Sequence, residues 1–234
     1  MIEAAHFLVT GHHATPFGRL PARSLLLRHA TEGWALVDTG LDGSLMRLPG
    51  AAAALYRLVT APRPAGEDPL GATLTRLGLT ARDVGRVVVT HLHPDHVCGL
   101  SRFGHAAVHM AEEAWALVRA PRRVRLRHGL LDGLLPPGLA PVIHRGALRI
   151  FGDDHAVTVP LPGHAPGHQG VHLPGLDTLY ACDASWGEAR ADRTLTPVVG
   201  DAATARATRA ALAGRAGTVL FCHTPSPHPW DVTP

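Results

Sequence analysis

The sequence has no lysine, only three cysteines and no long hydrophobic run, and each shortage excludes a class of protein. All 22 basic residues are arginine, beside abundant alanine, glycine and proline, so the basic balance is a residue bias and does not indicate a nucleic-acid partner. Cys98, Cys182 and Cys222 are odd in number and lack CxxC spacing, which argues against a disulfide framework and favours a reducing cytoplasm. No stretch reaches the roughly 18 apolar residues of a membrane span, and the first residues lack a signal-peptide pattern. We therefore expect a cytoplasmic protein that binds neither membrane nor nucleic acid.

What the sequence does contain is the pattern of one α/β domain over residues 1–234. Its 46% hydrophobic and 18% charged residues are typical of a globular protein. Short apolar runs bounded by glycine, proline or polar residues predict strands at residues 24–29, 34–38, 86–90, 106–110, 148–151, 156–161, 178–182 and 218–222. Other stretches predict helices at residues 111–118 and 201–213. This mixture indicates a layered sandwich with mixed sheets.

Two longer segments are candidates for loops over a site. The proline-rich residues 48–85 predict a helix, an irregular loop and a second helix over residues 70–77, and residues 120–141 predict another loop. Long loops in compact domains are often functional lids. The arginine run at residues 119–127 has no interleaved aromatic side chains, and is typical of a solvated helix face.

Histidine is the residue type that stands out, with seventeen copies. In VVVTHLHPDH, residues 87–96, an apolar run breaks into three histidines and one aspartate within six positions. If the chain stays extended, alternation places His91 and His93 on one side, while Asp95 and His96 turn away at the start of a helix or turn. Two groups of ligands then face two neighbouring points. Imidazole and carboxylate together suit zinc and also iron or manganese.

Three later residues can complete two coordination shells. His164 lies in the loop PGHAPGHQG after a predicted strand, and Asp183 and His223 each end an apolar run. The C-terminal ends of strands are where open α/β sheets place their sites. Singly, each residue also fits a turn, a helix cap or a loop, but together they supply the missing ligands. His168, in the same loop, could support a ligand or donate into the pocket, but a surface position is more typical of such a loop residue, and it is not expected as a ligand.

These motifs resemble those of the metallo-β-lactamase-fold superfamily. THLHPDH resembles its first metal motif, PGHAPGHQG its second, CDAS the segment of the bridging aspartate, and His223 its last ligand. The resemblance implies an α/β fold, a four-layer αββα sandwich with two mixed β-sheets and a site at the sheet edges. It also implies two divalent ions, the first held by His91, His93 and His164, the second by Asp95, His96 and His223, and both by Asp183.

Within the superfamily, PGHAPGHQG and CDAS are similar to the N-acyl-homoserine lactone lactonases, the quorum-quenching enzymes. Those enzymes have DASY, whose tyrosine is thought to polarise the lactone carbonyl. This chain has Trp186 there, and an indole N–H donates one hydrogen bond but cannot act as a phenol. We expect Trp186 to line the pocket as a weaker donor or an apolar wall, and packing under the proline-rich tail is the alternative. The resemblance makes Asp38, in VDTG, a carboxylate that orients a ligating histidine. Simple turn capping is the alternative for Asp38.

The expected function is attack on a carbonyl by a metal-bridging hydroxide, with a lactone or related ester as the small-molecule substrate. Two ions lower the pKa of a shared water to roughly 7 and stabilise the oxyanion. Asp95 is expected to pass a proton to the leaving group. Zinc is the favoured ion, and iron or manganese are alternatives. Alternative substrates are a β-lactam or a glyoxalase II-like thioester; a persulfide-type dioxygenase with a single iron is a different class, against which the complete second ligand set argues.

Overall fold

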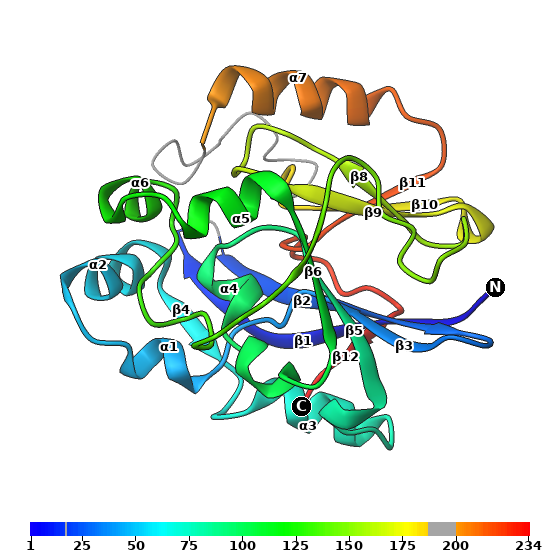
Figure 1. The fold of residues 1–234 in the computed structure, drawn as a ribbon, viewed down its shortest axis with the longest axis horizontal. Coiled ribbons are helices and arrows are strands. Elements are labelled where there is room, and N and C mark those ends of the chain that lie inside the picture. Colours follow the sequence, from blue (N-terminus) through cyan, green and yellow to red (C-terminus); the bar gives the residue numbers. More distant parts are fainter. Residues whose placement is uncertain (17, 187–199) are drawn as a thin grey trace.

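The computed structural model describes residues 1–16, 18–186 and 200–234 (Figure 1). The strands in this part of the chain are β1 (Ile2–Thr15), β2 (Gly18–His29), β3 (Gly33–Val37), β4 (Pro62–Pro64), β5 (Val84–Val89), β6 (Ala107–Ala111), β7 (Val142–His144), β8 (Val157–Pro160), β9 (Gln169–Leu173), β10 (Thr178–Cys182), β11 (Thr218–Phe221) and β12 (Asp231–Val232). The α-helices are α1 (Gly43–Arg47), α2 (Ala51–Thr60), α3 (Pro69–Arg76), α4 (Pro94–Val97), α5 (Glu112–Val118), α6 (Arg122–Arg127) and α7 (Ala202–Ala213).

The described strands form two β-sheets. The larger has the order β12-β1-β2-β3-β5-β6-β7, and β4 pairs with β1. Strands β1, β2 and β3 are antiparallel neighbours, whereas β3, β5, β6 and β7 are parallel neighbours. The smaller sheet has the order β11-β10-β9-β8, in which β10 and β11 are parallel and the other neighbours antiparallel. Both sheets are mixed, which confirms the predicted fold class.

Alternate residues of the central strands pack into two different cores. Leu26, Leu36 and Val87 belong to one core together with buried side chains of α1, α3, α4 and α5. Val37 and Val88 face the other way, against β9 and β10 of the smaller sheet. Successive strand residues point to opposite faces, so one sheet contributes to both cores. A third core, between the smaller sheet and α7, completes four layers, and Figure 1 shows α7 lying along that sheet.

Helix boundaries follow local chemistry. The side chain of Asp201 accepts two backbone N–H groups in the first turn of α7, and Gly214 follows the last residue of that helix. The side chain of Asp68 caps α3 by accepting the backbone N–H of Gly71. Pro69 occupies the first helical position, where the backbone N–H would form no hydrogen bond within the helix, so proline is tolerated there. The helices predicted at residues 111–118 and 201–213 are confirmed as α5 and α7.

Two local expectations differ from the structure. The N-terminal residues, for which no strand is predicted, form β1, because pairing with β2, β4 and β12 stabilises a segment with weak alternation. Gly11 permits the approach of β4, since a Cβ there would lie 2.5 Å from the carbonyl oxygen of Arg63. Residues 148–151, predicted as a strand, make an isolated bridge and then turn. Their apolar character instead serves the core, where Ile150 and Phe151 are buried.

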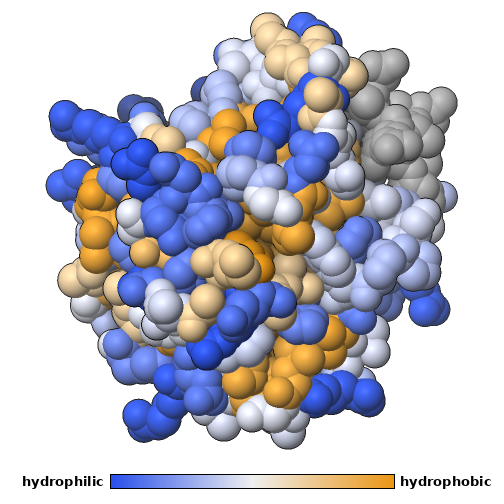
Figure 2. All heavy atoms as spheres, turned by 90° about the vertical axis from the view of Figure 1, so that its right-hand side faces the viewer, coloured by the Kyte–Doolittle hydropathy of each residue, from blue (hydrophilic) through white to orange (hydrophobic). Residues whose placement is uncertain are grey.

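The surface mixes polar and apolar side chains. The face that lies to the right in Figure 1 carries hydrophilic residues interspersed with small apolar groups (Figure 2), as is ordinary for globular proteins. Among the described helices, none combines the length and the apolar character needed to cross a bilayer. Three exposed apolar side chains gather on α2, namely Leu55, Leu58 and Val59.

Candidate metal centre

The end of β5 leads into four ligand-type side chains. After the strand, residues 90–93 remain outside regular structure, and α4 begins at Pro94, whose fixed φ suits the first helical position. His91 and His93 point to the same side, with His91 Nε2 3.0 Å from His93 Nδ1. Asp95 and His96 lie in the first turn of α4 and face a second point. All four side chains are buried, in the two-directional arrangement that alternation predicts.

His164 joins His91 and His93 in a first cluster. It lies in the loop after β8, and its Nε2 is 3.2 Å from His91 Nε2 and 3.0 Å from His93 Nδ1. Oδ2 of Asp183 is 3.4 Å from the same His164 nitrogen. Gly129 packs against the ring of His93, and a Cβ at this position would lie 2.5 Å from that ring. A side chain there would displace the imidazole, so the glycine allows the loop to hold it.

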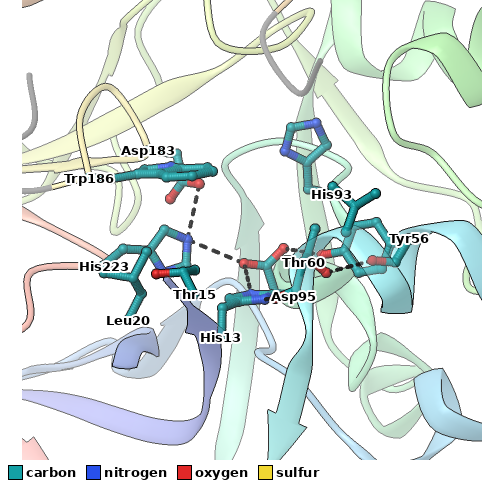
Figure 3. A pocket seen from close by; sticks show the side chains of 11 residues that line it. His13, Thr15, Leu20, Tyr56, Thr60, His93, Asp95, Asp183, Trp186 and His223 are labelled. Atoms are coloured by element: carbon teal, nitrogen blue, oxygen red, sulfur yellow. Dashed lines mark hydrogen bonds and ion pairs between the residues drawn. The ribbon is translucent and has the colours of Figure 1, made fainter. Parts of the chain in front are cut away.

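Asp183, which follows β10, also belongs to a second cluster with Asp95, His96 and His223. Nε2 of His223 lies 3.3 Å from Asp95 Oδ2 and 3.2 Å from Asp183 Oδ2. Nε2 of His96 lies 3.4 Å from Asp95 Oδ2 and 3.5 Å from Asp183 Oδ1. The structure therefore brings all seven predicted ligand residues into two neighbouring clusters that share Asp183, and Figure 3 shows part of the second.

In three of these imidazoles Nδ1, the nitrogen that faces away from the cluster, is held by a hydrogen bond. The Thr90 hydroxyl donates to Asp38 Oδ2 and therefore accepts from His91 Nδ1, 3.0 Å away. His96 Nδ1 donates to Asp38 Oδ2 at 2.8 Å, and His223 Nδ1 donates to a backbone carbonyl of β2 at 2.7 Å. In a neutral ring this bonding leaves Nε2 with a lone pair that faces the cluster, as metal-binding histidines require.

The donor set fits divalent metal ions. Lone pairs of imidazole nitrogens and carboxylate oxygens converge at 3.0 to 3.5 Å in both clusters, and such atoms repel one another unless a proton or a cation lies between them. The buried Nε2 of His96 has no hydrogen-bond partner among the described residues, and an unpaired buried nitrogen is costly. Imidazole with carboxylate suits zinc, iron or manganese.

The two clusters differ in charge. Burial holds the pKa of His91 and His164 well below the usual range and lowers the pKa of His93 to about 4. Burial also opposes protonation of His96 and His223, but the neighbouring carboxylates outweigh it and hold both pKa values well above the usual range. At neutral pH the first cluster thus offers neutral imidazoles, whereas the second holds protonated histidines beside carboxylates.

Asp38 is fixed so that its carboxylate holds the ring of His96. Its φ of 63° lies in the left-handed region, which is costly for a residue with a side chain. Oδ1 accepts the backbone N–H of Thr90 at 2.8 Å, and Oδ2 accepts both the Thr90 hydroxyl and His96 Nδ1. These three charge-assisted hydrogen bonds offset the backbone cost. Asp38 therefore does more than cap a turn.

A pocket opens over the second cluster (Figure 3). Its apolar wall includes Leu20, Val59 and Trp186, and the Trp186 indole lies edge-on to His223 with ring centroids 5.8 Å apart. A second hollow between α2 and α6 shares part of this wall, including Tyr56, and its other apolar lining residues are Ala52, Leu55, Leu126 and Leu131. An apolar path therefore adjoins the clusters.

Two residues at the site are absent from the sequence-based set. The hydroxyl of Tyr56, on α2, donates to Asp95 Oδ1 at 3.1 Å. Nε2 of His13, on β1, lies 3.1 Å from Asp95 Oδ2, and its Nδ1 donates to the carbonyl of Thr60. They lie 39 and 82 positions from Asp95 in the sequence. Neither forms a motif with it, so only the fold brings them there.

His168 is buried, so its expected surface position is wrong. Nδ1 donates to the carbonyl of Leu161 at 2.7 Å, and Nε2 accepts the backbone N–H of Asp183 at 3.3 Å. Both ring nitrogens are therefore used, and the ring links the loop after β8 to the loop after β10. This link holds Asp183 in place.

The residues after His223 are held by a buried arginine. Arg23, on β2, forms two hydrogen bonds with Asp231, at 2.7 and 2.8 Å, and donates to the carbonyls of Thr224 and Ser226. A fully paired buried guanidinium is rigid because its planar donors need several acceptors at once. Arg23 thus ties the residues after His223 to β2.

Comparison with known proteins agrees with this geometry. The model of the metallo-beta-lactamase superfamily matches residues 17–224. A probable metallo-hydrolase of Mycobacterium tuberculosis is 32% identical over 158 residues, which cover 63% of this chain and 51% of the relative. An N-acyl homoserine lactonase of Agrobacterium fabrum is 31% identical over 120 residues, 46% of each protein. The chain thus spans about half the length of the curated relatives it matches.

A solved structure extends the similarity to nearly the whole chain. It is an N-acyl homoserine lactone hydrolase with the product N-hexanoyl-L-homoserine bound at its catalytic metal centre. The alignment has a TM-score of 0.74 at 19% identity and covers 96% of this chain and 94% of the other. At that identity the likeness supports the fold alone. With the family model spanning residues 17–224 and the predicted motifs assembled in space, this chain belongs to the metallo-beta-lactamase superfamily.

Proposed function

We propose that this chain is a metal-dependent hydrolase that opens a lactone or a related ester at a centre of two divalent ions. The observation that carries the proposal is the pair of buried histidine and carboxylate clusters that share Asp183 beneath an apolar pocket. Zinc is the favoured ion, and iron or manganese are alternatives. The ligands of the first ion are His91, His93, His164 and Asp183, and those of the second are Asp95, His96, Asp183 and His223.

The protein positions the ligand side chains for this chemistry. Two divalent ions at such a centre lower the pKa of a bound water to roughly 7 and polarise a substrate carbonyl. The ligands come from three connections that follow β5, β8 and β10, and from the end of β11. Anchors on the far side of the rings, such as Asp38 on His96, hold those ligands in a fixed orientation.

Asp95 is the proton carrier in this proposal. Burial would raise the pKa of Asp95, but the histidines that face its carboxylate outweigh burial and hold the pKa well below the usual range. The carboxylate is therefore ionised and can accept a proton and return it to the leaving alkoxide. The hydroxyl of Tyr56 donates to Oδ1, which leaves Oδ2 directed at His96 and His223. Burial raises the pKa of Tyr56, so this phenol stays a donor.

The shape and polarity of the pocket support an acylated ring substrate. Trp186 and Leu20 provide apolar walls beside the second cluster, and the hollow between α2 and α6 continues the apolar lining away from it. A lactone ring over the clusters would leave an acyl chain along this hollow, where burial of each CH₂ contributes about 0.8 kcal/mol. The name of the lactonase relative supports the same substrate class.

The test is a substrate panel on metal-loaded protein with measured metal content. The panel contains N-acyl homoserine lactones of increasing chain length, a β-lactam, a glutathione thioester and a glutathione persulfide with oxygen uptake. We expect turnover of lactones, with kcat/KM rising with chain length, and its loss after chelation and in His91→Ala. Preferred cleavage of the lactam or thioester would replace the substrate assignment. One iron per chain with oxygen uptake would overturn the hydrolase.

A further inference from the structure

His13 faces the second cluster in the same manner as His96 and His223. The ring lies on β1 and is buried, with Nε2 3.1 Å from Asp95 Oδ2 and with the ring centroid 5.5 Å from that of His223. His13, Asp95 and His223 place three donor atoms within 4.8 Å of one another. We propose that His13 Nε2 is a further ligand of the second ion, an inference that rests on the two-ion centre proposed above.

The hydrogen bonding of the ring supports this role. His13 Nδ1 lies 3.0 Å from the carbonyl of Thr60, which can only accept, so Nδ1 carries the hydrogen. That carbonyl belongs to the last residue of α2, where helix carbonyls lack intrahelical partners. His96 and His223 are anchored through Nδ1 by an acceptor in the same way. In all three rings Nε2 therefore points at Asp95 Oδ2, from three different elements.

His168 is a buried histidine of the same site whose hydrogen bonds differ from those of His13, because its Nε2 is not directed at the second cluster. Its Nδ1 also donates to a carbonyl, but its Nε2 accepts the backbone N–H of Asp183. Both nitrogens of His168 are thus satisfied by the protein. The Nε2 of His13 meets only a carboxylate oxygen in the described contacts. A neutral His13, like a neutral His96, would direct a lone pair at Asp95, and a cation between the two would relieve their repulsion.

The ordinary alternative is an ion pair, in which a protonated His13 caps α2 and donates to Asp95. The two arrangements differ in what binds the nitrogen, and so they can be separated by measurement. As a ligand, His13 gives the second ion five protein donors, namely His13, Asp95, His96, Asp183 and His223. The first ion has four.

The deciding experiment uses the full chain labelled with ¹⁵N-histidine and loaded with ¹¹³Cd²⁺ as the probe metal. We expect two cadmium signals, with scalar coupling to the Nε2 nitrogens of His96, His223 and His13 at one of them. In His13→Gln that signal shifts and loses one coupling, and chelator competition shows that its ion is bound at least about tenfold more weakly. The other cadmium signal and its affinity stay unchanged.

His12→Ala is the matched control, because His12 is the preceding residue of β1 and its side chain points to the other face of the strand. It should leave both cadmium signals unchanged, and thermal melting should show that each variant is folded. Two bound ions without coupling at His13 Nε2 would overturn the ligand role and establish the ion pair, while the proposed hydrolase would stand. A single bound ion in the parent protein would overturn the two-ion centre itself.

Discussion

The two halves of the candidate centre are built from similar residues but in opposite electrostatic states. The first half gathers three imidazoles whose pKa values burial lowers, so its lone pairs are free at neutral pH. The second half pairs histidines of raised pKa with ionised carboxylates. An ion enters the first half without displacing protons, but must displace them from the second. Similar ligand residues can therefore differ in how many protons an ion releases when it binds.

The halves also differ in how far apart in the sequence their parts lie. The first half comes from the loops after β5 and β8, with Asp183 from the end of β10. The second half adds residues from β1 and α2, which hold both oxygens of Asp95 through His13 and Tyr56. Long-range contacts thus surround the carboxylate that we propose as the proton carrier. Each prediction below changes one half more than the other, except the first.

Loss of the shared carboxylate should have the largest effect, because it weakens both halves at once. In Asp183→Asn we expect bound metal to fall and turnover to drop by about a thousandfold or more, since metal catalysis supplies several kcal/mol. Elemental analysis and steady-state kinetics measure the two effects. Asp154→Asn, at an exposed ion pair with Arg149, is the control. Parental turnover in Asp183→Asn would remove Asp183 from the centre.

The pH dependence of ion binding should separate the halves. The raised pKa values of His96 and His223 mean that both hold protons at neutral pH, so affinity of the second half falls as pH falls, by up to about a hundredfold per unit for two protons. The first half should keep its affinity until the pH approaches about 4, the pKa of His93. Chelator competition between about pH 6 and 8 measures this difference. Parallel pH profiles for both ions would contradict it.

The same shifts predict opposite effects on the stability of the metal-free protein. The raised pKa values in the second half add stability that is present below the unfolded value of 6.5 and is lost as pH rises through the folded values. The lowered values in the first half add stability above 6.5 that is lost as pH falls through the folded values. Thermal melting of metal-free protein across this range measures the balance.

Removing the anchor of His96 should weaken mainly the second half. In Asp38→Asn a neutral amide replaces the carboxylate that accepts the hydrogen bond from His96 Nδ1. We expect the second ion to bind about 10–100-fold more weakly. The first ion should change less, because Asp38 reaches His91 only through the Thr90 hydroxyl. Asp42→Asn is the control, since this buried carboxylate pairs with Arg102 instead. Equal weakening of both ions would contradict the assignment.

Removing the phenol from Asp95 should affect turnover more than metal content. Tyr56→Phe deletes a hydrogen bond to a charged group, worth about 1.5–3 kcal/mol, so kcat should fall by roughly tenfold or more. Tyr180→Phe deletes a hydroxyl that donates to a backbone carbonyl in the core, and should leave kcat near the parental value. If Tyr56→Phe keeps its full kcat, the hydroxyl has no part in the reaction.

The smallest effect is expected at Trp186, which lines the pocket beside His223 without a hydrogen bond to the clusters in the described contacts. Trp186→Ala should raise KM for long-chain lactones several-fold, because it removes apolar wall. Trp186→Tyr should raise lactone turnover if the phenol reaches the substrate carbonyl. Kinetics on the same lactone series tests both variants. Unchanged values in both would place Trp186 outside the substrate contacts.

The strands and helices were predictable wherever local pattern and tertiary packing agree. Apolar runs bounded by glycine, proline or polar residues predicted β5, β8, β10 and β11, and the alanine-rich spacing that ends at Gly214 predicted α7. β1 was not predictable, because Gly11 and its histidines look irregular until β2, β4 and β12 pair with them. For residues 148–151 the sequence predicts a strand that the structure lacks. Their apolar side chains pack into the core without the backbone forming a strand of either sheet.

The sequence alone determined the ligand chemistry, since short motifs at strand ends put His91, His93, Asp95 and His96 where local geometry must direct them to two points. The surroundings of these ligands depend on the tertiary structure. His13 and Tyr56 meet Asp95 through contacts that span 82 and 39 positions, and no local pattern encodes a contact between distant segments. Burial, too, exists only in the folded chain, and it makes one group of histidines neutral while facing carboxylates keep the other protonated.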